Sequence, residues 1–217
     1  MAWSVVVPVK PLALAKSRLA HGLGPVPRSA LALAFALDTV AAAASCGAVR
    51  DVAVVTDDAL AGAELAGLGA RVLPEPAGGG GLNAALAHGA RWVRSHRPRA
   101  AVATLNADLP ALRPGELARV LAAAGEFPRA FLADAAGIGT TLLAAAPGVD
   151  LEPAFEGRSR ARHLASGACE IAVADVDSVR QDVDSEADLR AALALGVGPR
   201  TAAAARGLPA CGAARSD

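Results

Sequence analysis

Asp108 is the residue whose type and position in this sequence best suit it to hold a metal ion. It follows residues 100–105, which are apolar on both faces, as expected of a central strand in a parallel sheet covered by helices. Pro110 and Pro114 end that strand and open the next helix. Because open α/β sheets bind ligands at the carboxyl edge of their strands, a carboxylate here suits a Mg²⁺ ion that holds phosphates. The alternative is that Asp108 only caps a turn.

A pair of carboxylates occurs late in the chain. Residues 180–184 have the pattern of a strand, and the alternation of a strand puts Asp182 and Asp184 on the same face. Two carboxylates on one face repel each other unless they are solvated or a cation bridges them. Asp184 directly precedes a predicted helix cap and is the natural second ligand of a metal held by Asp108. Whether Asp182 assists stays open.

A positively charged loop follows the first predicted strand. That strand covers residues 4–9, and the loop over residues 10–18 contains Lys10, Lys16 and Arg18. Three cations at the carboxyl edge of the sheet can neutralise a triphosphate. The alternative is a solvated charged loop.

Four consecutive glycines, residues 78–81, directly precede a helix predicted over residues 82–95. Such a run is unfavourable unless another group approaches the backbone closely. Its spacing matches neither the Walker motif nor the Rossmann motif, the two common phosphate-binding glycine motifs. The sequence favours contact of a base or ribose with this segment, and the alternative is a flexible linker. The candidate nucleotide-binding residues are Gly79, Gly80, Gly81 and Asn83.

A basic segment over residues 155–163 surrounds another predicted helix start. An anion can bind there on the free backbone amides of the helix end. Before it, residues 134–143 predict a glycine turn that enters a strand directly, as expected of a substrate-binding region added to a nucleotide-binding half. The alternatives are an exposed basic helix and, for His163, a surface or packing position.

The elements that position these residues alternate between strand and helix for most of the chain. Ser185 and Asp188 form a capping-box pattern. Further strands are predicted over residues 52–55, 71–73 and 129–133, and helices over residues 27–44, 59–68, 114–124 and 186–195. The sequence therefore predicts a three-layer α/β/α fold with a mostly parallel mixed sheet, in one domain over residues 1–200 with a frayed tail over residues 201–217.

The composition argues against several classes of protein. Lys and Arg number 21 and so do Asp and Glu, so no overall positive field attracts nucleic acid or an anionic membrane. The longest apolar stretch, residues 30–44, is interrupted by Asp38 and Thr39, which argues against a membrane-spanning helix. No signal peptide is predicted, so the expected location is the cytoplasm. The three cysteines lack the spacing of a zinc site or of a disulfide framework.

In their order, these segments resemble the compact GT-A-like nucleotidyltransferases, most closely the 2-phospho-L-lactate or phosphoenolpyruvate guanylyltransferases of deazaflavin coenzyme F-420 biosynthesis. The resemblance covers residues 5–201. The matching motifs are VPVKPLALAKSRL, GGGLNAAL, NADLPAL, GIGTTLL, FEGRSRARH and DVDSEADL followed by LGVGPRT. Each motif alone is weak, and six in the family's order are specific.

The resemblance implies that the substrates are GTP and a small phosphorylated three-carbon acid, and that Asp108 and Asp184 bind Mg²⁺. It implies that Thr140, Gly157 and Ser159 contact the phosphorylated acid and that the glycine segment lies in the nucleotide region. The family's reaction needs charge neutralisation and alignment, so the three cations of the first loop are candidate catalytic residues beside Asp108.

Two positions depart from the family's pattern. Asn106 stands where many nucleotidyltransferases carry a second acid, and Glu156 stands where the family usually has glycine. Either Glu156 or Gly157 can therefore supply the backbone contact to the acceptor. The alanine- and arginine-rich composition resembles the high-GC bacterial branch and favours phosphoenolpyruvate over 2-phospholactate.

Other functions stay open on the sequence alone. One is a molybdopterin or sugar-1-phosphate nucleotidyltransferase with the same fold and metal site. Another is a non-catalytic regulator that binds a nucleotide. The sequence also leaves open whether the chain forms a homodimer, because an apolar helix has the same pattern whether it packs on a sheet or on a neighbouring chain.

Overall fold

The computed structural model describes residues 1–14 and 28–206 of the chain. Two of the predicted cations, Lys16 and Arg18, lie outside the described residues.

A seven-stranded mixed sheet forms the centre of the molecule, with the strand order β3-β2-β1-β4-β6-β5-β7. Among the described strands, β6 alone runs antiparallel to its neighbours, β4 and β5. The strands are β1 (Trp3–Pro8), β2 (Val49–Val55), β3 (Arg71–Leu73), β4 (Ala101–Leu105), β5 (Arg129–Ala133), β6 (Thr140–Ala145) and β7 (Cys169–Glu170). The predicted entry from a glycine turn directly into a strand is confirmed at β6.

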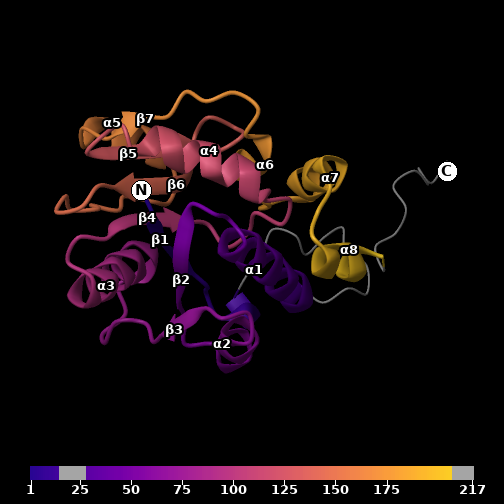
Figure 1. Ribbon diagram of the computed structural model, residues 1–217. Helices are drawn as coiled ribbons and strands as arrows, with labels where there is room; N and C mark the ends of the chain where they lie inside the picture. Colours follow the sequence, from indigo (N-terminus) through magenta and orange to yellow (C-terminus); the bar gives the residue numbers. More distant parts are fainter. Residues whose placement is uncertain (15–27, 207–217) are drawn as a thin grey trace.

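Helices cover both faces of this sheet (Figure 1). On one face, Val5 and Val7 share a core with residues of α1, α2 and α4. On the other face, Val6 shares a core with residues of α3. The helices are α1 (Arg28–Ala44), α2 (Ala59–Ala66), α3 (Gly81–His96), α4 (Pro114–Ala124), α5 (Ser159–Ala165), α6 (Asp177–Arg180), α7 (Glu186–Leu195) and α8 (Pro199–Ala205), with a 3-10 helix at Leu12–Leu14. The alternation of a strand thus divides the apolar residues between two cores and confirms the three-layer fold.

The strand predicted over residues 180–184 is absent. Helix α6 ends at Arg180, and residues 181–184 form no regular helix or strand. The backbone N–H of Val183 donates to the carbonyl of Asp108, 3.1 Å away, so this segment attaches to the turn after β4 instead of to a sheet neighbour. The prediction that Asp182 and Asp184 share a face of a strand is therefore wrong.

The chain from residue 201 to 206 is folded, which corrects the predicted start of the frayed tail. Helix α8 lies beside α1 (Figure 1), and Thr201 is buried. The buried carboxylate of Asp38 in α1 accepts hydrogen bonds from the backbone N–H groups of Thr201, at 2.7 Å, and Arg200, at 3.3 Å. An alanine-rich sequence without clear periodicity gives no sign of such a cap, because the capping residue is 163 positions away from Thr201. Within the part of the chain that the structure describes, no helix has the length and apolar character needed to cross a membrane.

Candidate active site

A cavity of about 570 Å³ opens at the carboxyl edge of the parallel strands. The start of the antiparallel strand β6 lies at the same edge, because its direction is reversed. Segments that follow β1, β4 and β5 line the cavity together with residues 155–157, Ser159, Asp182 and Asp184. Its described lining includes Lys10, Asp108, Thr140, Gly157, Ser159 and Asp184, all predicted from the sequence.

The two aspartates predicted to bind metal come from segments that are joined to each other. The carbonyl of Asp108 accepts from the backbone of Val183, which directly precedes Asp184. The backbone N–H of Leu109 donates to the hydroxyl of Thr39 in α1, 3.1 Å away, and this bond holds the turn after β4. Both residues line one cavity although 76 positions separate them in the sequence.

Helix α6, which leads into the Asp184 segment, is held by a buried acid. Glu116 of α4 accepts from both the backbone N–H and the hydroxyl of Ser178, at 2.9 Å and 2.7 Å. Arg113 pairs with the same carboxylate at 3.2 Å. Neither Glu116 nor Ser178 was recognised in the sequence, where a glutamate in an apolar helix gives little indication of its partner.

The described lining of the cavity is strongly acidic. It contains one cation, Lys10, and five carboxylates: Asp108, Asp134, Asp182, Asp184 and Glu156. Among the described residues, no group of three or more His, Cys, Asp or Glu side chains is arranged to hold a metal on its own. This donor set fits Mg²⁺, which proteins usually hold through one or two carboxylates together with water and substrate phosphates.

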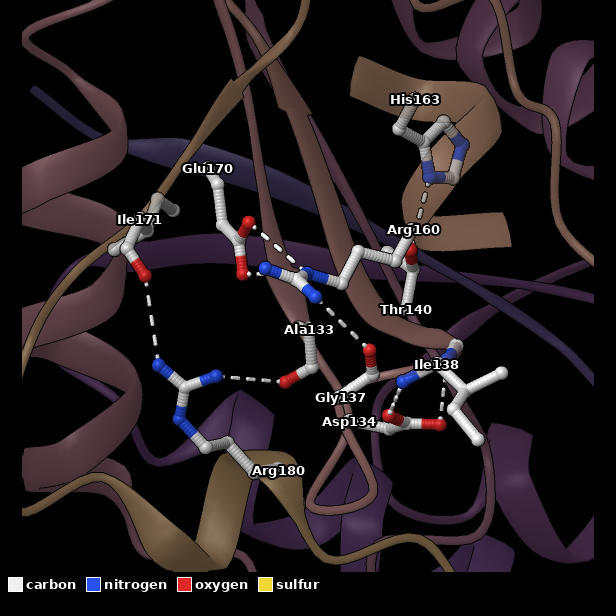
Figure 2. Close-up of polar contacts among 11 residues, drawn as sticks. Ala133, Asp134, Gly137, Ile138, Thr140, Arg160, His163, Glu170, Ile171 and Arg180 are labelled. Carbon is white, nitrogen blue, oxygen red and sulfur yellow. Dashed lines mark hydrogen bonds and ion pairs between the residues drawn. The ribbon is translucent and has the colours of Figure 1, made fainter. Parts of the chain in front are cut away.

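The turn between β5 and β6 forms one wall of the cavity. The carboxylate of Asp134 accepts from the backbone N–H groups of Ile138 and Gly139, both at 2.8 Å (Figure 2). A Cβ atom at Gly139 would lie 2.4 Å from Asp134 Oδ2, so the turn needs glycine at this position. Asp134 and Gly139 were not predicted as site residues. An aspartate followed by a glycine-containing turn is the signal that could have indicated them.

Arginines beside this wall bind the protein itself. The Nε atom of Arg160 lies 3.0 Å from each carboxylate oxygen of Glu170, and Nη1 donates to the carbonyl of Gly137 at 3.2 Å (Figure 2). Arg180 donates to the carbonyl of Ala133 at 2.9 Å. Arg160 therefore has a structural partner. The predicted binding of an anion to the backbone amides of this helix start stays a prediction.

His163 is buried in α5, with 0% of its surface exposed. Its Nδ1 atom lies 2.9 Å from Thr140 Oγ1, and its Nε2 atom accepts from the backbone N–H of Ala154 at 3.1 Å. The rings of Phe131 and Phe155 lie 5.5 Å and 5.1 Å from the imidazole, centre to centre. The surface position considered for His163 is thereby wrong, and its polar contacts go beyond simple packing.

Asn83 binds the protein segment beside the cavity. Its Oδ1 atom accepts from the backbone N–H of Phe155 at 2.7 Å, and its Nδ2 atom donates to the carbonyl of the same residue at 3.3 Å. Asn83 does not line the described cavity, and neither do Gly79, Gly80 and Gly81, although Leu82 does. The predicted contacts of these residues with a nucleotide stay predictions.

The backbone of Glu156 has the conformation that favours glycine. Its φ angle is 80°, and that of Gly157 is 53°. Both residues line the cavity. The glycine that the family usually carries at position 156 thus matches the local backbone, and Glu156 adopts this conformation at a steric cost of about 1–2 kcal/mol.

Comparison with known proteins identifies the family. Residues 33–176 match the MobA-like NTP transferase domain. The chain is 70% identical over 205 residues to the phosphoenolpyruvate guanylyltransferase of Streptomyces coelicolor, with 94% of this chain and 96% of that protein covered. It is 71% identical over 206 residues to the phosphoenolpyruvate guanylyltransferase of Streptomyces avermitilis, with 94% of each covered. The chain belongs to the phosphoenolpyruvate guanylyltransferase family.

The fold of this member of the phosphoenolpyruvate guanylyltransferase family also occurs in solved structures. A nucleotidyl transferase from Methanothermobacter superposes with a TM-score of 0.61 at 22% identity, covering 89% of this chain and 97% of that chain. The similarity confirms the predicted nucleotidyltransferase fold.

Proposed function

We propose that this chain transfers GMP from GTP to phosphoenolpyruvate and releases pyrophosphate, in the biosynthesis of deazaflavin coenzyme F-420. The observation that carries the proposal is the cavity in which Lys10, Asp108, Thr140 and Asp184 meet, in a member of a family named for this reaction. The names of the relatives support phosphoenolpyruvate over 2-phospholactate, which is also the acceptor that the composition favours.

The chemistry is a displacement at phosphorus. A phosphate oxygen of phosphoenolpyruvate attacks the α-phosphorus of GTP, the bond from that phosphorus to the oxygen bridging to the β-phosphate breaks, and pyrophosphate leaves with the bonding electrons. A phosphate monoester is already a nucleophile near neutral pH, so we propose neither a general base nor a covalent enzyme intermediate. The chain contributes alignment and charge neutralisation through Lys10 and, outside the described residues, Lys16 and Arg18.

Asp108 and Asp184 are the proposed ligands of Mg²⁺. The bond from Val183 to the Asp108 carbonyl, which brings their segments together at the cavity, supports this assignment. The acidic lining supports it as well, because carboxylates repel anionic substrates unless a cation lies between them. When bound, the ion would neutralise and orient the substrate phosphates. Asp182, which also lines the cavity, is a further candidate ligand.

Thr140, Gly157 and Ser159 are proposed to bind the phosphorylated acid. Thr140 and Ser159 are only 4% and 2% exposed, and both line the cavity, so their polar groups are held among packed neighbours. Hydroxyl and backbone N–H groups are suitable donors to phosphate and carboxylate oxygens. The glycine segment at the start of α3 is proposed to contact the nucleotide.

A pyrophosphate-release assay tests this function. Each of the four nucleoside triphosphates is combined with phosphoenolpyruvate, 2-phospholactate, a sugar 1-phosphate or molybdopterin in the presence of Mg²⁺, and the product is identified by mass. We expect rapid release with GTP and phosphoenolpyruvate. Preference for a sugar phosphate or molybdopterin would support the related nucleotidyltransferases instead. Tight nucleotide binding without pyrophosphate from any pair would support a regulator.

A further inference from the structure

The hydrogen bonds of His163 determine which of its ring nitrogens carries the proton. The backbone N–H of Ala154 can only donate, so the Nε2 atom of His163 that receives it, at 3.1 Å, has no proton. A neutral imidazole then carries its proton on Nδ1. That nitrogen lies 2.9 Å from the Thr140 hydroxyl (Figure 2), so His163 donates and Thr140 Oγ1 accepts.

The surroundings of His163 keep the ring neutral. The side chain is fully buried. This burial, together with the positive charges of Arg129 on β5 and Arg162 on α5, lowers the pKa of His163 to about 4 from 6.5. Arg129 in turn pairs with Glu152, which precedes the segment bound to the imidazole. The proton arrangement derived from the hydrogen bonds therefore holds throughout the neutral pH range.

The direction of this bond determines what the Thr140 hydroxyl can do. Because its oxygen accepts from His163, its single proton is left for another acceptor. Thr140 is the first residue of β6 and lines the cavity that also contains Gly157 and Ser159. An anionic oxygen in that cavity is a strong acceptor for a hydroxyl proton.

We infer that His163 is a positioning residue for the acceptor substrate: its bond from Nδ1 to Thr140 Oγ1 directs the threonine proton into the cavity, toward an oxygen of the phosphorylated acid. The same imidazole holds Ala154, and Asn83 holds the next residue, Phe155. His163 thus connects the two segments proposed to surround the phosphorylated acid, which are the start of β6 and residues 154–157. This inference rests on the proposed function, since it assigns the cavity an anionic acceptor.

Two substitutions of His163 separate its two hydrogen bonds. Asparagine places an amide nitrogen close to the position of Nδ1, so His163→Asn keeps the donor to Thr140 and loses the acceptor for Ala154. Glutamine reaches the position of Nε2, so His163→Gln keeps the acceptor for Ala154 and loses the donor to Thr140. The pair is matched in polarity, and His96→Gln, on α3, serves as a control.

Steady-state kinetics with GTP and phosphoenolpyruvate test the inference. In His163→Gln we expect the KM for phosphoenolpyruvate to rise about 10-fold, the lower end for one hydrogen bond to a charged group, while the KM for GTP is unchanged. His163→Asn should stay much closer to wild type. In a Thr140→Val background, His163→Gln should raise the KM no further, because the hydroxyl that it orients is gone. An equal further rise in that background, or equal effects of the two substitutions at His163, would overturn the inference.

A spectroscopic measurement tests the proton arrangement without turnover. In ¹⁵N-labelled protein at pH 7, the His163 signal should show a protonated Nδ1 and an unprotonated Nε2, and comparison with His163→Asn identifies it among the four histidines. A protonated Nε2 would overturn the inference even if the variants fail to fold. If wild type makes no product from GTP and phosphoenolpyruvate, the proposed function fails; if it makes product and His163→Gln leaves the KM unchanged, only the inference fails.

Discussion

The two regions that we propose for the two substrates differ in how their backbone is held. In the proposed acceptor region, the side chains of Asp134, His163 and Asn83 each bind backbone groups of the turn or of residues 154–155. In the proposed nucleotide region, the described glycine segment has a backbone bond from Gly79 to the carbonyl of Pro76, at 3.1 Å. Cβ atoms added at three of its glycines would meet nothing within 4 Å: Gly78, Gly79 and Gly81.

This difference matches what each substrate needs. A three-carbon acid offers few atoms, so its binding depends on donors that are already fixed before it arrives. A nucleotide offers a base, a ribose and three phosphates, and it can use an open backbone surface. We therefore expect substitutions in the acceptor region to act through lost side-chain contacts, and substitutions in the nucleotide region to act through backbone conformation.

The largest effect is expected at the proposed metal ligands. Asp108→Asn and Asp184→Asn should each lower kcat/KM by about 100-fold or more, because each removes a charge that serves both substrates. Both variants should melt near the wild-type temperature, since little apolar burial is lost. Asp150→Asn is the control, because the Asp150 side chain is 92% exposed. Near-normal turnover of either variant at saturating Mg²⁺ would remove that residue from the proposed site.

His163, in the proposed acceptor region, should also make the free energy of unfolding depend on pH. Since the pKa of His163 is lowered to about 4 from 6.5, the unfolded chain binds this proton more readily than the folded protein does. The free energy of unfolding should be highest above pH 6.5 and fall toward pH 4, with a contribution from His163 of roughly 3 kcal/mol. Urea denaturation at pH 7.5 and 4.5 measures it. His163→Asn should reduce the difference, whereas His96→Asn should not; equal differences in all three proteins would contradict the prediction.

A smaller effect is expected from closing the space beside Asp134. Gly139→Ala puts a Cβ atom 2.4 Å from the Asp134 carboxylate. The turn must shift, which should lower the free energy of unfolding by about 1–3 kcal/mol and raise the KM for phosphoenolpyruvate more than that for GTP. In Gly115→Ala, within α4, the added Cβ meets nothing within 4 Å, so stability should rise by about 0.5–1 kcal/mol. If Gly139→Ala instead raises the KM for GTP alone, this turn belongs to the nucleotide region and not to the acceptor region.

The smallest effect is expected in the proposed nucleotide region. Gly80→Ala forces a φ of 110° on an L-residue and brings its Cβ 2.7 Å from that of Ala84, so the KM for GTP should rise more than that for phosphoenolpyruvate. Gly78→Ala shares a positive φ of 87° without a close contact and should have a weaker effect. Adopting such a φ costs a non-glycine residue about 1–2 kcal/mol. If both variants leave the KM for GTP unchanged, the glycine segment does not contact the nucleotide.

The sequence by itself predicted the features that depend on neighbouring residues. The apolar run of β4, the end of helix α1 at Ala44, helix α4 with both its bounds, and the Ser185–Asp188 capping box are all confirmed. The order of the motifs identified the family, because six motifs spread along the chain can be matched in the sequence alone. Strand and helix periodicity and capping are local properties, so they can be recognised before the partners are known.

The tertiary structure decided which distant groups bind each other. Val183 binds the turn of Asp108, and Asn83 binds Phe155, 72 positions away. His163 differs from an ordinary core histidine through the N–H of Ala154, which determines the position of its proton. A side chain such as Asn or His can donate or accept in many settings, so its residue type leaves its partner undetermined. Folding selects that partner, because the packing of the sheet and helices determines which backbone groups come within hydrogen-bonding distance.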